Sequence, residues 1–239
     1  MSKNNTCQHI AFIMDGNGRW AKRRNLPRHL GHKEGCLRVI EIYEGCRENG
    51  IKAMSLYAFS TENWSRPKSE INHLFTYLEQ FFKREIDRLD REGARIIISG
   101  DLSKIRERTR KVINDAVLRT ENNDEFYLNI CLNYGSRDEI IRATKNFCLD
   151  VLNNKYRVED LSEQLFSSYL YTAILPPIDL LIRTSGEQRL SNYLLYQLAY
   201  SEFIFTPVAW PDFNKNELKK CLEEYKNRDR RYGGLSNEE

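Results

Sequence analysis

The hydrophobic positions of the chain fall into two kinds of segment that alternate along the sequence. Short apolar runs rich in strand-forming residues are typical of buried β-strands. They cover residues 9–14, 51–59, 94–99, 126–132, 178–183 and 203–208. The segments between them have the spacing of helices. The pattern therefore predicts an α/β fold with a mainly parallel six-stranded sheet flanked by helices.

Residues 67–91 carry the clearest helical pattern, because their apolar positions form one wide stripe. The stripe consists of Ile71, Leu74, Phe75, Leu78, Phe81, Phe82, Ile86 and Leu89. Pro67 suits the first turn of such a helix, and Gly93 suits its end. The stretch SRDE at 136–139 predicts a further helix that opens with a capping box. No repeat, linker or low-complexity tract interrupts the pattern, so we expect residues 1–239 to form a single domain.

The composition narrows the class of partner. The 239 residues include 37 basic and 34 acidic side chains, a net charge of +3, so no overall attraction to nucleic acid follows. The six cysteines are scattered without a C-x-x-C pair, and no charged-then-apolar leader precedes them, which favours reduced thiols in a cytoplasmic protein. No apolar run approaches the roughly 18 residues that span a bilayer, so any membrane contact is expected to be peripheral.

Candidate chemistry gathers where the expected strands end, which is where parallel sheets bind ligands. The first strand is followed by DGNGRW, the second by STENWSR, the fourth by NYGSR and the fifth by RTSGEQRLS. Gly16 and Gly18 let backbone N–H groups approach an anion. Arg19 and Arg28 supply forked donors that match phosphate oxygens. The stretch after the first strand therefore predicts a diphosphate site.

Asp15 lies beside these cations and would by itself repel a diphosphate. Mg²⁺ binds through one or two carboxylates together with phosphate oxygens of a substrate, so Asp15 predicts a magnesium ion. The alternative is that Asp15 only caps a turn. Residues 16–21 also fit the dinucleotide fingerprint G-x-G-x-x-A. A dinucleotide site needs an apolar helix directly after the fingerprint, but the segment that follows is rich in charged residues and ends at Pro27. Glu62 also lies too far along the chain to bind a ribose. Both observations argue against a dinucleotide site.

A second basic group follows the fifth strand. Arg183 ends this strand, and we expect Arg189 and Ser191 at the start of the next helix, where N–H groups favour anions. Two separate anion sites indicate two phosphorylated substrates. Taken alone, Arg183 could equally form a salt bridge at the strand end. Glu202 is either a second metal ligand or a surface acid, because its spacing does not distinguish the two.

Apolar side chains flank these polar loops. The stripe on 67–91 is wide enough to leave surface for a long hydrocarbon, although an ordinary core-facing helix has the same pattern. Phe59 and Trp64 stand beside polar Ser60 and Arg66, and this mixture suits a ligand with a charged head and an apolar tail.

Long stretches of the sequence resemble the cis-prenyltransferases, and among them the bacterial undecaprenyl diphosphate synthases. The matching stretches include HIAFIMDGNGRWAKRR, LYAFSTENWSRP, LNYGSRDEI, LLIRTSGEQRLSNYLLYQLAYSEF, WPDF and RRYGG, and they span nearly the whole chain. The resemblance implies a homodimer whose parallel sheet and helices enclose a hydrophobic tunnel. It also implies Mg²⁺-dependent, repeated cis condensation of isopentenyl diphosphate onto an allylic diphosphate, usually farnesyl diphosphate. The implied product is undecaprenyl diphosphate, the lipid carrier precursor for cell-wall synthesis, made in the cytoplasm with peripheral membrane contact for its release.

The resemblance also assigns roles to residues. Asp15 is the implied acid that holds Mg²⁺ and assists departure of the diphosphate, and Glu202 is a second metal-linked acid. Asn63 is implied in proton removal, but an amide has no useful basicity near neutral pH and at most positions the proton. The implied substrate contacts are Gly16, Asn17, Gly18, Arg19, Trp20, Arg28 and His32 for the allylic diphosphate, Ser60, Thr61, Glu62, Trp64 and Arg66 over the reacting ends, and Arg183, Arg189, Leu190 and Ser191 for isopentenyl diphosphate. Arg231 and Gly233 are implied to reach a neighbouring subunit.

One departure from the family pattern and two competing hypotheses remain. Ser136 stands where the family more often has glycine, and the small Ala58 is compatible with an open tunnel. A noncatalytic accessory subunit of a two-component cis-prenyltransferase would lack the acid and basic groups that Asp15, Arg19 and Arg28 provide. A dinucleotide-binding oxidoreductase would bind a nicotinamide cofactor. The D-D-x-x-D clusters of trans-prenyltransferases do not occur in the sequence.

Overall fold

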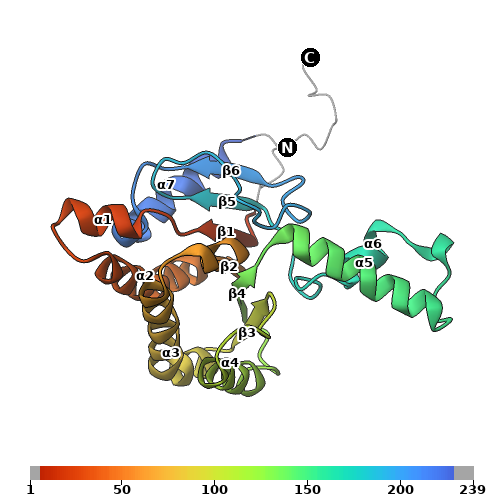
Figure 1. The fold of residues 1–239 in the computed structure, drawn as a ribbon. Coiled ribbons are helices and arrows are strands. Elements are labelled where there is room, and N and C mark those ends of the chain that lie inside the picture. Colours follow the sequence, from red (N-terminus) through yellow and green to blue (C-terminus); the bar gives the residue numbers. More distant parts are fainter. Residues whose placement is uncertain (1–5, 229–239) are drawn as a thin grey trace, which may run out of the picture.

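Six parallel strands form the centre of the molecule (Figure 1). The computed structural model describes residues 6–228, so the expected roles of Arg231 and Gly233 lie outside the described residues. The strands are β1 (His9–Ile13), β2 (Ala53–Ser60), β3 (Ala94–Ser99), β4 (Phe126–Tyr134), β5 (Leu180–Arg183) and β6 (Glu202–Phe205). Their order is β3-β4-β2-β1-β5-β6, and all neighbours pair in parallel. The predicted sheet is confirmed.

Helices connect the strands at nearly every crossover. They are α1 (Asn17–Arg23), α2 (Arg28–Glu48), α3 (Lys68–Arg91), α4 (Glu107–Arg119), α5 (Ser136–Leu152), α6 (Glu163–Ser168) and α7 (Lys215–Lys226). Three short 3₁₀ turns cover Thr61–Ser65, Val158–Asp160 and Trp210–Asp212. The helix predicted over 67–91 is confirmed: α3 starts directly after Pro67, and Gly93 follows it with a left-handed φ of 71°. Within residues 6–228, no helix has the length and apolar character needed to cross a membrane.

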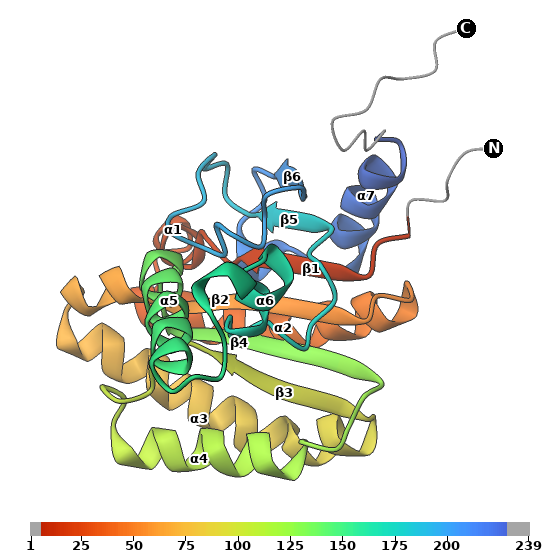
Figure 2. The ribbon, with the colours of Figure 1, turned by 90° about the vertical axis from the view of Figure 1, so that its right-hand side faces the viewer.

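The helices α2, α3, α4 and α7 cover one face of the sheet, with α3 and α4 side by side (Figure 2). Ile10 and Phe12 of β1 point into this layer and are fully buried. The Phe12 ring lies 5.7 Å from the Trp210 ring and 6.2 Å from that of Phe213. Side chains of this size each contribute about 1.5–3 kcal/mol when buried, so this layer holds β1 in place in the interior of the sheet.

The opposite face is covered mainly by irregular chain. Tyr193, Leu194 and Leu198 pack there against Ala11 and Ile13 of β1. They belong to the β5–β6 connection, in which residues 184–201 contain turns and no helix.

The helix predicted at Arg189 and Ser191 is therefore wrong. Ser191, Asn192 and Leu194 have φ values of 52°, 62° and 45°. These left-handed conformations cost L-residues energy and do not occur within a right-handed helix. The turns instead direct Ser191 back toward the end of β5.

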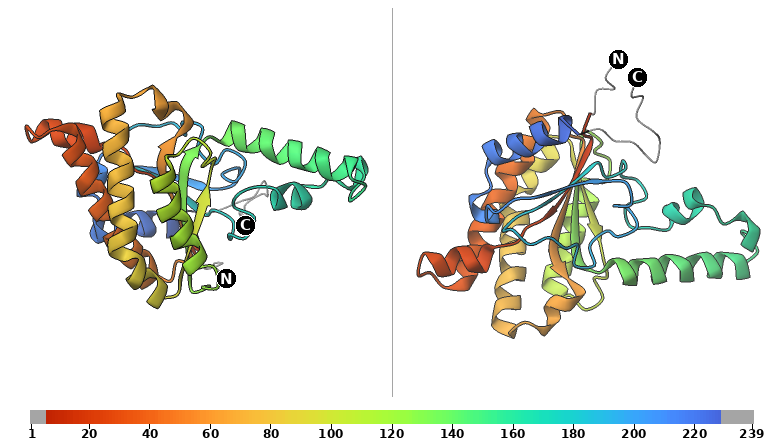
Figure 3. Two further views of the ribbon diagram at one scale, coloured as in Figure 1. Left: turned by 60° about the horizontal axis from the view of Figure 1, so that its bottom comes forward. Right: turned by 90° about the horizontal axis from the view of Figure 1, so that it is seen from above.

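The helices α5 and α6 project from the sheet as an arm (Figure 3). α5 begins at Ser136 as expected, but the predicted capping box does not form, because Gly135 occupies the cap position and provides no side-chain bond. The Ser136 hydroxyl accepts a bond from the Leu195 N–H at 3.0 Å. The Glu139 carboxylate is buried and accepts bonds from the Tyr134 hydroxyl and, at 2.8 Å, from the Tyr171 N–H. Both side chains therefore fix the opposite face of the sheet instead of the helix end.

Candidate functional site

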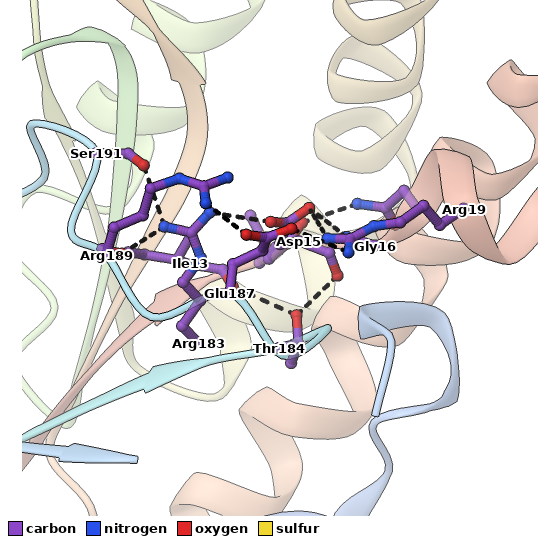
Figure 4. A network of polar contacts seen from close by, with 11 residues as sticks. Ile13, Asp15, Gly16, Arg19, Arg183, Thr184, Glu187, Arg189 and Ser191 are labelled. Atoms are coloured by element: carbon purple, nitrogen blue, oxygen red, sulfur yellow. Dashed lines mark hydrogen bonds and ion pairs between the residues drawn. The ribbon is translucent and has the colours of Figure 1, made fainter. Parts of the chain in front are cut away.

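Asp15 meets Arg183 at the carboxyl end of the sheet. β1 and β5 are neighbours in register, with Ile13 opposite Arg183, so the turn after β1 lies over the end of β5. The Arg183 Nη2 donates to Asp15 Oδ2 at 3.0 Å, and the Thr184 hydroxyl donates to the Asp15 carbonyl at 2.8 Å (Figure 4). The sequence placed these residues in separate anion sites, whereas the fold brings them into direct contact.

Gly16 gives the turn its shape. Its φ of 98° is left-handed, and a Cβ there would lie 2.7 Å from the Ser185 Oγ, so only glycine fits without displacement. The Gly16 N–H donates to Asp15 Oδ1 at 2.6 Å. This bond fixes the carboxylate orientation before any ligand binds.

The Asp15 carboxylate stays ionised at neutral pH. Burial opposes its ionisation, but bonds from Arg183 and the Gly16 N–H outweigh this, so the pKa lies below its usual value of 3.8. Arg19 adds a further charge, with its Nη2 at 3.3 Å from Asp15 Oδ1. Arg19 also bonds Glu187 at 3.1 Å, and Glu187 in turn pairs with Arg189. The carboxylates of Asp15 and Glu187 thus join the basic loop after β1 to the basic loop after β5 (Figure 4).

Arg183 is the most enclosed cation of the site, with 3% of its surface exposed. Besides Asp15, its guanidinium donates to the Ser191 Oγ at 3.1 Å and to the Arg189 carbonyl. Its Nε is buried and finds no hydrogen-bond acceptor among the described residues. A buried charge with an unused donor is suited to an anionic ligand, which would supply the missing acceptor.

An apolar cavity of about 360 Å³ opens beside these groups. Its polar rim contains Asp15, Asn17, His32, Ser60, Asn63, Arg66, Arg183, Arg189 and Ser191. Its apolar wall comes from β1, β2, β4, α2 and α3 and includes Val39, Ala58, Phe59, Leu74, Phe75, Leu78 and Leu132. A charged rim over an apolar wall fits a ligand with an anionic head and a hydrocarbon tail. The volume is at the low end for a small-molecule site, and the longer tunnel stays a prediction.

A second cluster of basic side chains converges on Glu70, which the sequence interpretation missed. The Glu70 Oε1 lies 3.2 Å from the Arg28 Nε, 3.0 Å from the Arg66 Nη1 and 3.5 Å from the His32 Nε2. The spacing of Arg66 and Glu70 by four residues at the start of α3 was the available signal. Burial lowers the pKa of His32 to about 4 despite the nearby Glu70, so its ring is neutral at pH 7.

Several expected site residues support the rim from outside the cavity. The Trp20 Nε1 donates to Asp212 at 2.6 Å, which fastens α1 to the Trp210–Asp212 turn. The Trp64 Nε1 donates to Asn133 at 2.7 Å. Leu190 packs against the core on the irregular face. The other residues expected at the site but absent from the cavity wall are Gly16, Gly18, Arg19, Arg28, Thr61 and Glu62.

Glu202 does not join the site within one chain. It starts β6 opposite Leu180, whereas Asp15 follows the other end of the sheet, beyond Arg183. The three residue steps from Leu180 to Arg183 alone span about 10 Å. The Glu202 carboxylate instead pairs with Arg228 at 2.9 Å. Within one chain Glu202 thus lies away from Asp15, and its role as a second metal ligand stays a prediction.

The residues at the cavity rim are suited to a metal ion that is bound jointly by the protein and a phosphorylated ligand. They are less suited to a metal ion held by protein side chains alone. Residues 6–228 contain no group of three or more His, Cys, Asp and Glu side chains arranged to hold a metal ion. Asp15 provides a single carboxylate at the cavity rim. Mg²⁺ commonly binds in this way, with one or two carboxylates and the phosphate oxygens of a substrate.

Comparison with known proteins gives consistent matches over nearly the whole chain. Residues 13–233 match the family model described as "Putative undecaprenyl diphosphate synthase". The "Isoprenyl transferase" of Clostridium perfringens is 49% identical over 228 residues, which cover 95% of this chain and 90% of that protein. The "Isoprenyl transferase" of Leptospira interrogans is 47% identical and covers 98% of both.

Two solved structures share the fold. Lavandulyl diphosphate synthase from Lavandula x intermedia, in complex with dimethylallyl diphosphate, has a TM-score of 0.93 and 33% identity. The match covers 96% of this chain and 99% of that one. A "probable undecaprenyl diphosphate synthase" from Campylobacter jejuni has a TM-score of 0.79 and 32% identity, covering 95% and 98% of the two chains.

Proposed function

The chain belongs to the undecaprenyl diphosphate synthase family of cis-prenyltransferases, and from this premise we propose that it elongates farnesyl diphosphate with isopentenyl diphosphate, forming cis double bonds. The proposed product is undecaprenyl diphosphate, and the proposed unit of function is the single domain of residues 1–239. The observation that carries the proposal is the ionised Asp15, paired with the buried Arg183 at the rim of an apolar cavity.

The cations of the rim have a chemical role in this reaction. Ionisation of an allylic diphosphate places negative charge on the departing group, and preorganised guanidinium groups stabilise that charge as it develops. Arg19 and Arg28 are held in place by the partly exposed carboxylates of Asp15 and Glu70, which a more highly charged diphosphate can replace. The apolar wall excludes water from the carbocation-like carbon. When bound, Mg²⁺ supplies further positive charge against the diphosphate.

The second diphosphate site is proposed at Arg183, Arg189 and Ser191. Arg183 contributes a forked donor that is already oriented by Asp15 and Ser191. In the proposed complex the isopentenyl group lies beside the apolar wall, next to the bond that must form.

Asn63 is a proposed positioning group for the proton that leaves. Its Oδ1 accepts a bond from the Ser60 N–H at 3.2 Å, within a capping box at the start of the Thr61–Ser65 turn. The oxygen already accepts one bond, and the amide nitrogen is the group that can donate to a ligand. An NH₂ group donates hydrogen bonds and takes up no proton at neutral pH, so the base must be the diphosphate or water.

Product length is the finer part of the proposal. The dimethylallyl diphosphate in the lavender enzyme supports binding of a prenyl diphosphate at this fold. The bacterial isoprenyl transferases are more similar to this chain, at 47% to 49% identity against 33% for the lavender enzyme, and this favours chain elongation.

Incubating the purified full chain with farnesyl diphosphate, radiolabelled isopentenyl diphosphate and Mg²⁺ tests the function. We expect a ladder of elongated products that ends near undecaprenyl diphosphate on chromatographic sizing, with turnover abolished by EDTA and restored by Mg²⁺. A product that stops after one condensation would contradict the proposed chain length. No condensation with any allylic diphosphate would contradict the proposed activity.

We also propose that the enzyme is a cytoplasmic homodimer that contacts the inner membrane face only to release product. Support for the dimer comes from the arm formed by α5 and α6, where large apolar side chains remain exposed. They are Ile141, Leu149, Leu152, Val158 and Leu161. Ile141, Leu149 and Leu152 follow the helical repeat and lie along one side of α5. An apolar stripe that no other described element covers suits a second copy of the arm.

Substituting Leu149 by lysine is expected to weaken the dimer by at least about tenfold, because the stripe would carry an unpaired charge. Sedimentation velocity over a range of protein concentrations measures the change. The matched control is Leu118→Lys on α4, since Leu118 is similarly exposed, at 63% against 56%. A native-like dimer in Leu149→Lys, or equal weakening in both variants, would rule out this surface.

A further inference from the structure

Asn192 joins three loops that come from three different strands. Its side-chain Nδ2 donates to Glu62 Oε1 at 3.1 Å, and its Oδ1 accepts a bond from the Arg137 N–H at 3.0 Å. Its carbonyl accepts a bond from the Ser136 N–H at 2.8 Å. It therefore links the turn after β2, the start of α5 after β4, and the connection after β5.

The backbone is shaped for this junction. Asn192 has a φ of 62°, a left-handed conformation that asparagine and aspartate tolerate better than other non-glycine residues. Gly135 lies so close that a Cβ there would approach the Asn192 Nδ2 to 2.7 Å and the Thr61 Oγ1 to 2.8 Å. The loop at Gly135 therefore meets the loops at Asn192 and Thr61 without room for a side chain at position 135.

Each end of the junction belongs to a different part of the proposed site. On one side, Asn192 directly follows Ser191, whose Oγ accepts a bond from the buried Arg183. On the other side, Glu62 lies in the Thr61–Ser65 turn, which has no buried residue of its own and borders the cavity through Asn63. A turn with so little burial depends on polar contacts for its order.

We propose that Asn192 is a positioning residue that ties the Thr61–Ser65 turn to the Arg183 and Ser191 loop. A diphosphate bound by Arg183 and Ser191 thereby also orders the turn over the reacting ends. This inference rests on the proposed function for its link to catalysis. The mechanical link between the two loops is independent of the reaction.

A double-mutant cycle between positions 192 and 62 tests the contact. Asn192→Asp keeps the shape, the left-handed tolerance and the acceptor for the Arg137 N–H, but it turns an oxygen toward Glu62. We expect kcat/KM for isopentenyl diphosphate to fall on the order of tenfold, the range for a lost hydrogen bond to a charged group. The dissociation constant of the allylic diphosphate should stay unchanged. In a Glu62→Gln background, where the new amide can donate to the new aspartate, Asn192→Asp should have little further effect.

Hydrogen exchange gives a readout without turnover. In the native chain, inorganic pyrophosphate should slow exchange of the amides of residues 61–65, and Asn192→Asp should abolish this protection. Glu62→Ala should abolish this protection too. Because this substitution does not alter the loop of residues 185–194, it provides the test if Asn192→Asp fails to fold. Asn154→Asp is the matched control, because Asn154 is exposed and has a similar φ of 58°.

The outcomes separate the two proposals. Native-like kinetics and protection in Asn192→Asp, or equal losses in both Glu62 backgrounds, would overturn the role of Asn192. A different outcome separates this role from the proposed function. If pyrophosphate protects residues 61–65 of the native chain and Asn192→Asp abolishes this protection, but the native chain makes no prenyl product, the link is supported and the proposed function is overturned.

Discussion

Asp15→Ala is expected to lower kcat by about a thousandfold or more while the chain remains folded. The carboxylate is the anionic group that the structure aims at the cavity rim, and its loss removes the proposed Mg²⁺ ligand. Interactions made mainly in the transition state appear in kcat, and removal of one such electrostatic group typically costs about 10²–10³-fold. The metal and the carboxylate are lost together here, so we expect the upper end of this range.

The affinity of Asp15→Ala for pyrophosphate, in contrast to its kcat, should not fall when Mg²⁺ is absent. Asp15→Ala leaves the guanidinium of Arg183 without its carboxylate partner and removes a negative charge that repels diphosphate. Isothermal titration should therefore show pyrophosphate binding at least as tightly as in the native chain when Mg²⁺ is absent. The matched control is Asp101→Ala, at the end of β3 on the same sheet edge, whose carboxylate bonds only Ser103 in the described structure. A kcat within about tenfold of native in Asp15→Ala would contradict the assignment.

The fold was predictable because its strands are short, apolar and separated by amphipathic helices. The stripe on residues 67–91 specified α3 to within a residue, since a proline and a glycine mark its ends. The β5–β6 connection was not predictable in the same way. Its apolar residues Leu194, Leu195 and Leu198 have a spacing that fits a helix, and only the left-handed φ values at Ser191, Asn192 and Leu194 exclude one.

The meeting of Asp15 and Arg183 was predictable from the strand ends. Arg183 ends β5 and Asp15 closely follows the end of β1, and parallel pairing of these two strands brings both residues to one edge of the sheet. The position of Glu202 could have been inferred from the same rule, because a residue that starts a parallel strand lies at the opposite edge. Glu70 was harder to identify: its partners Arg28 and His32 come from α2, and only tertiary packing brings them to the start of α3.

Arg183→Gln is expected to raise the KM for isopentenyl diphosphate by about a hundredfold and to leave the affinity for the allylic diphosphate nearly unchanged. Replacing the buried guanidinium by a neutral amide forfeits charge-assisted bonds to phosphate oxygens, each worth roughly twice a neutral one. Arg183→Lys should recover only part of the loss, because an ammonium lacks the fork that reaches Asp15 and Ser191 together. Arg157→Gln controls for loss of an arginine, since the Arg157 side chain is 79% exposed and, among residues 6–228, forms an ion pair with Asp160 alone. Equal KM values in Arg183→Gln and Arg157→Gln would contradict the proposed site.

The same variant should shift the pH dependence of kcat/KM, and the sign follows from Asp15. In the native chain burial raises the pKa of Asp15, but the bond and charge of Arg183, with the Gly16 N–H bond and the Arg19 charge, hold this pKa below 3.8. Activity that requires the ionised carboxylate is then lost only as the pH falls through that low pKa. Without the guanidinium, burial remains and raises the pKa, so the acidic limb of the Arg183→Gln profile should move to higher pH. Rates measured from pH 8 down to the lowest pH at which circular dichroism shows both proteins folded test this shift, because the native acidic limb lies below pH 4. Superimposable acidic limbs would mean that Arg183 does not hold Asp15 in its ionised form.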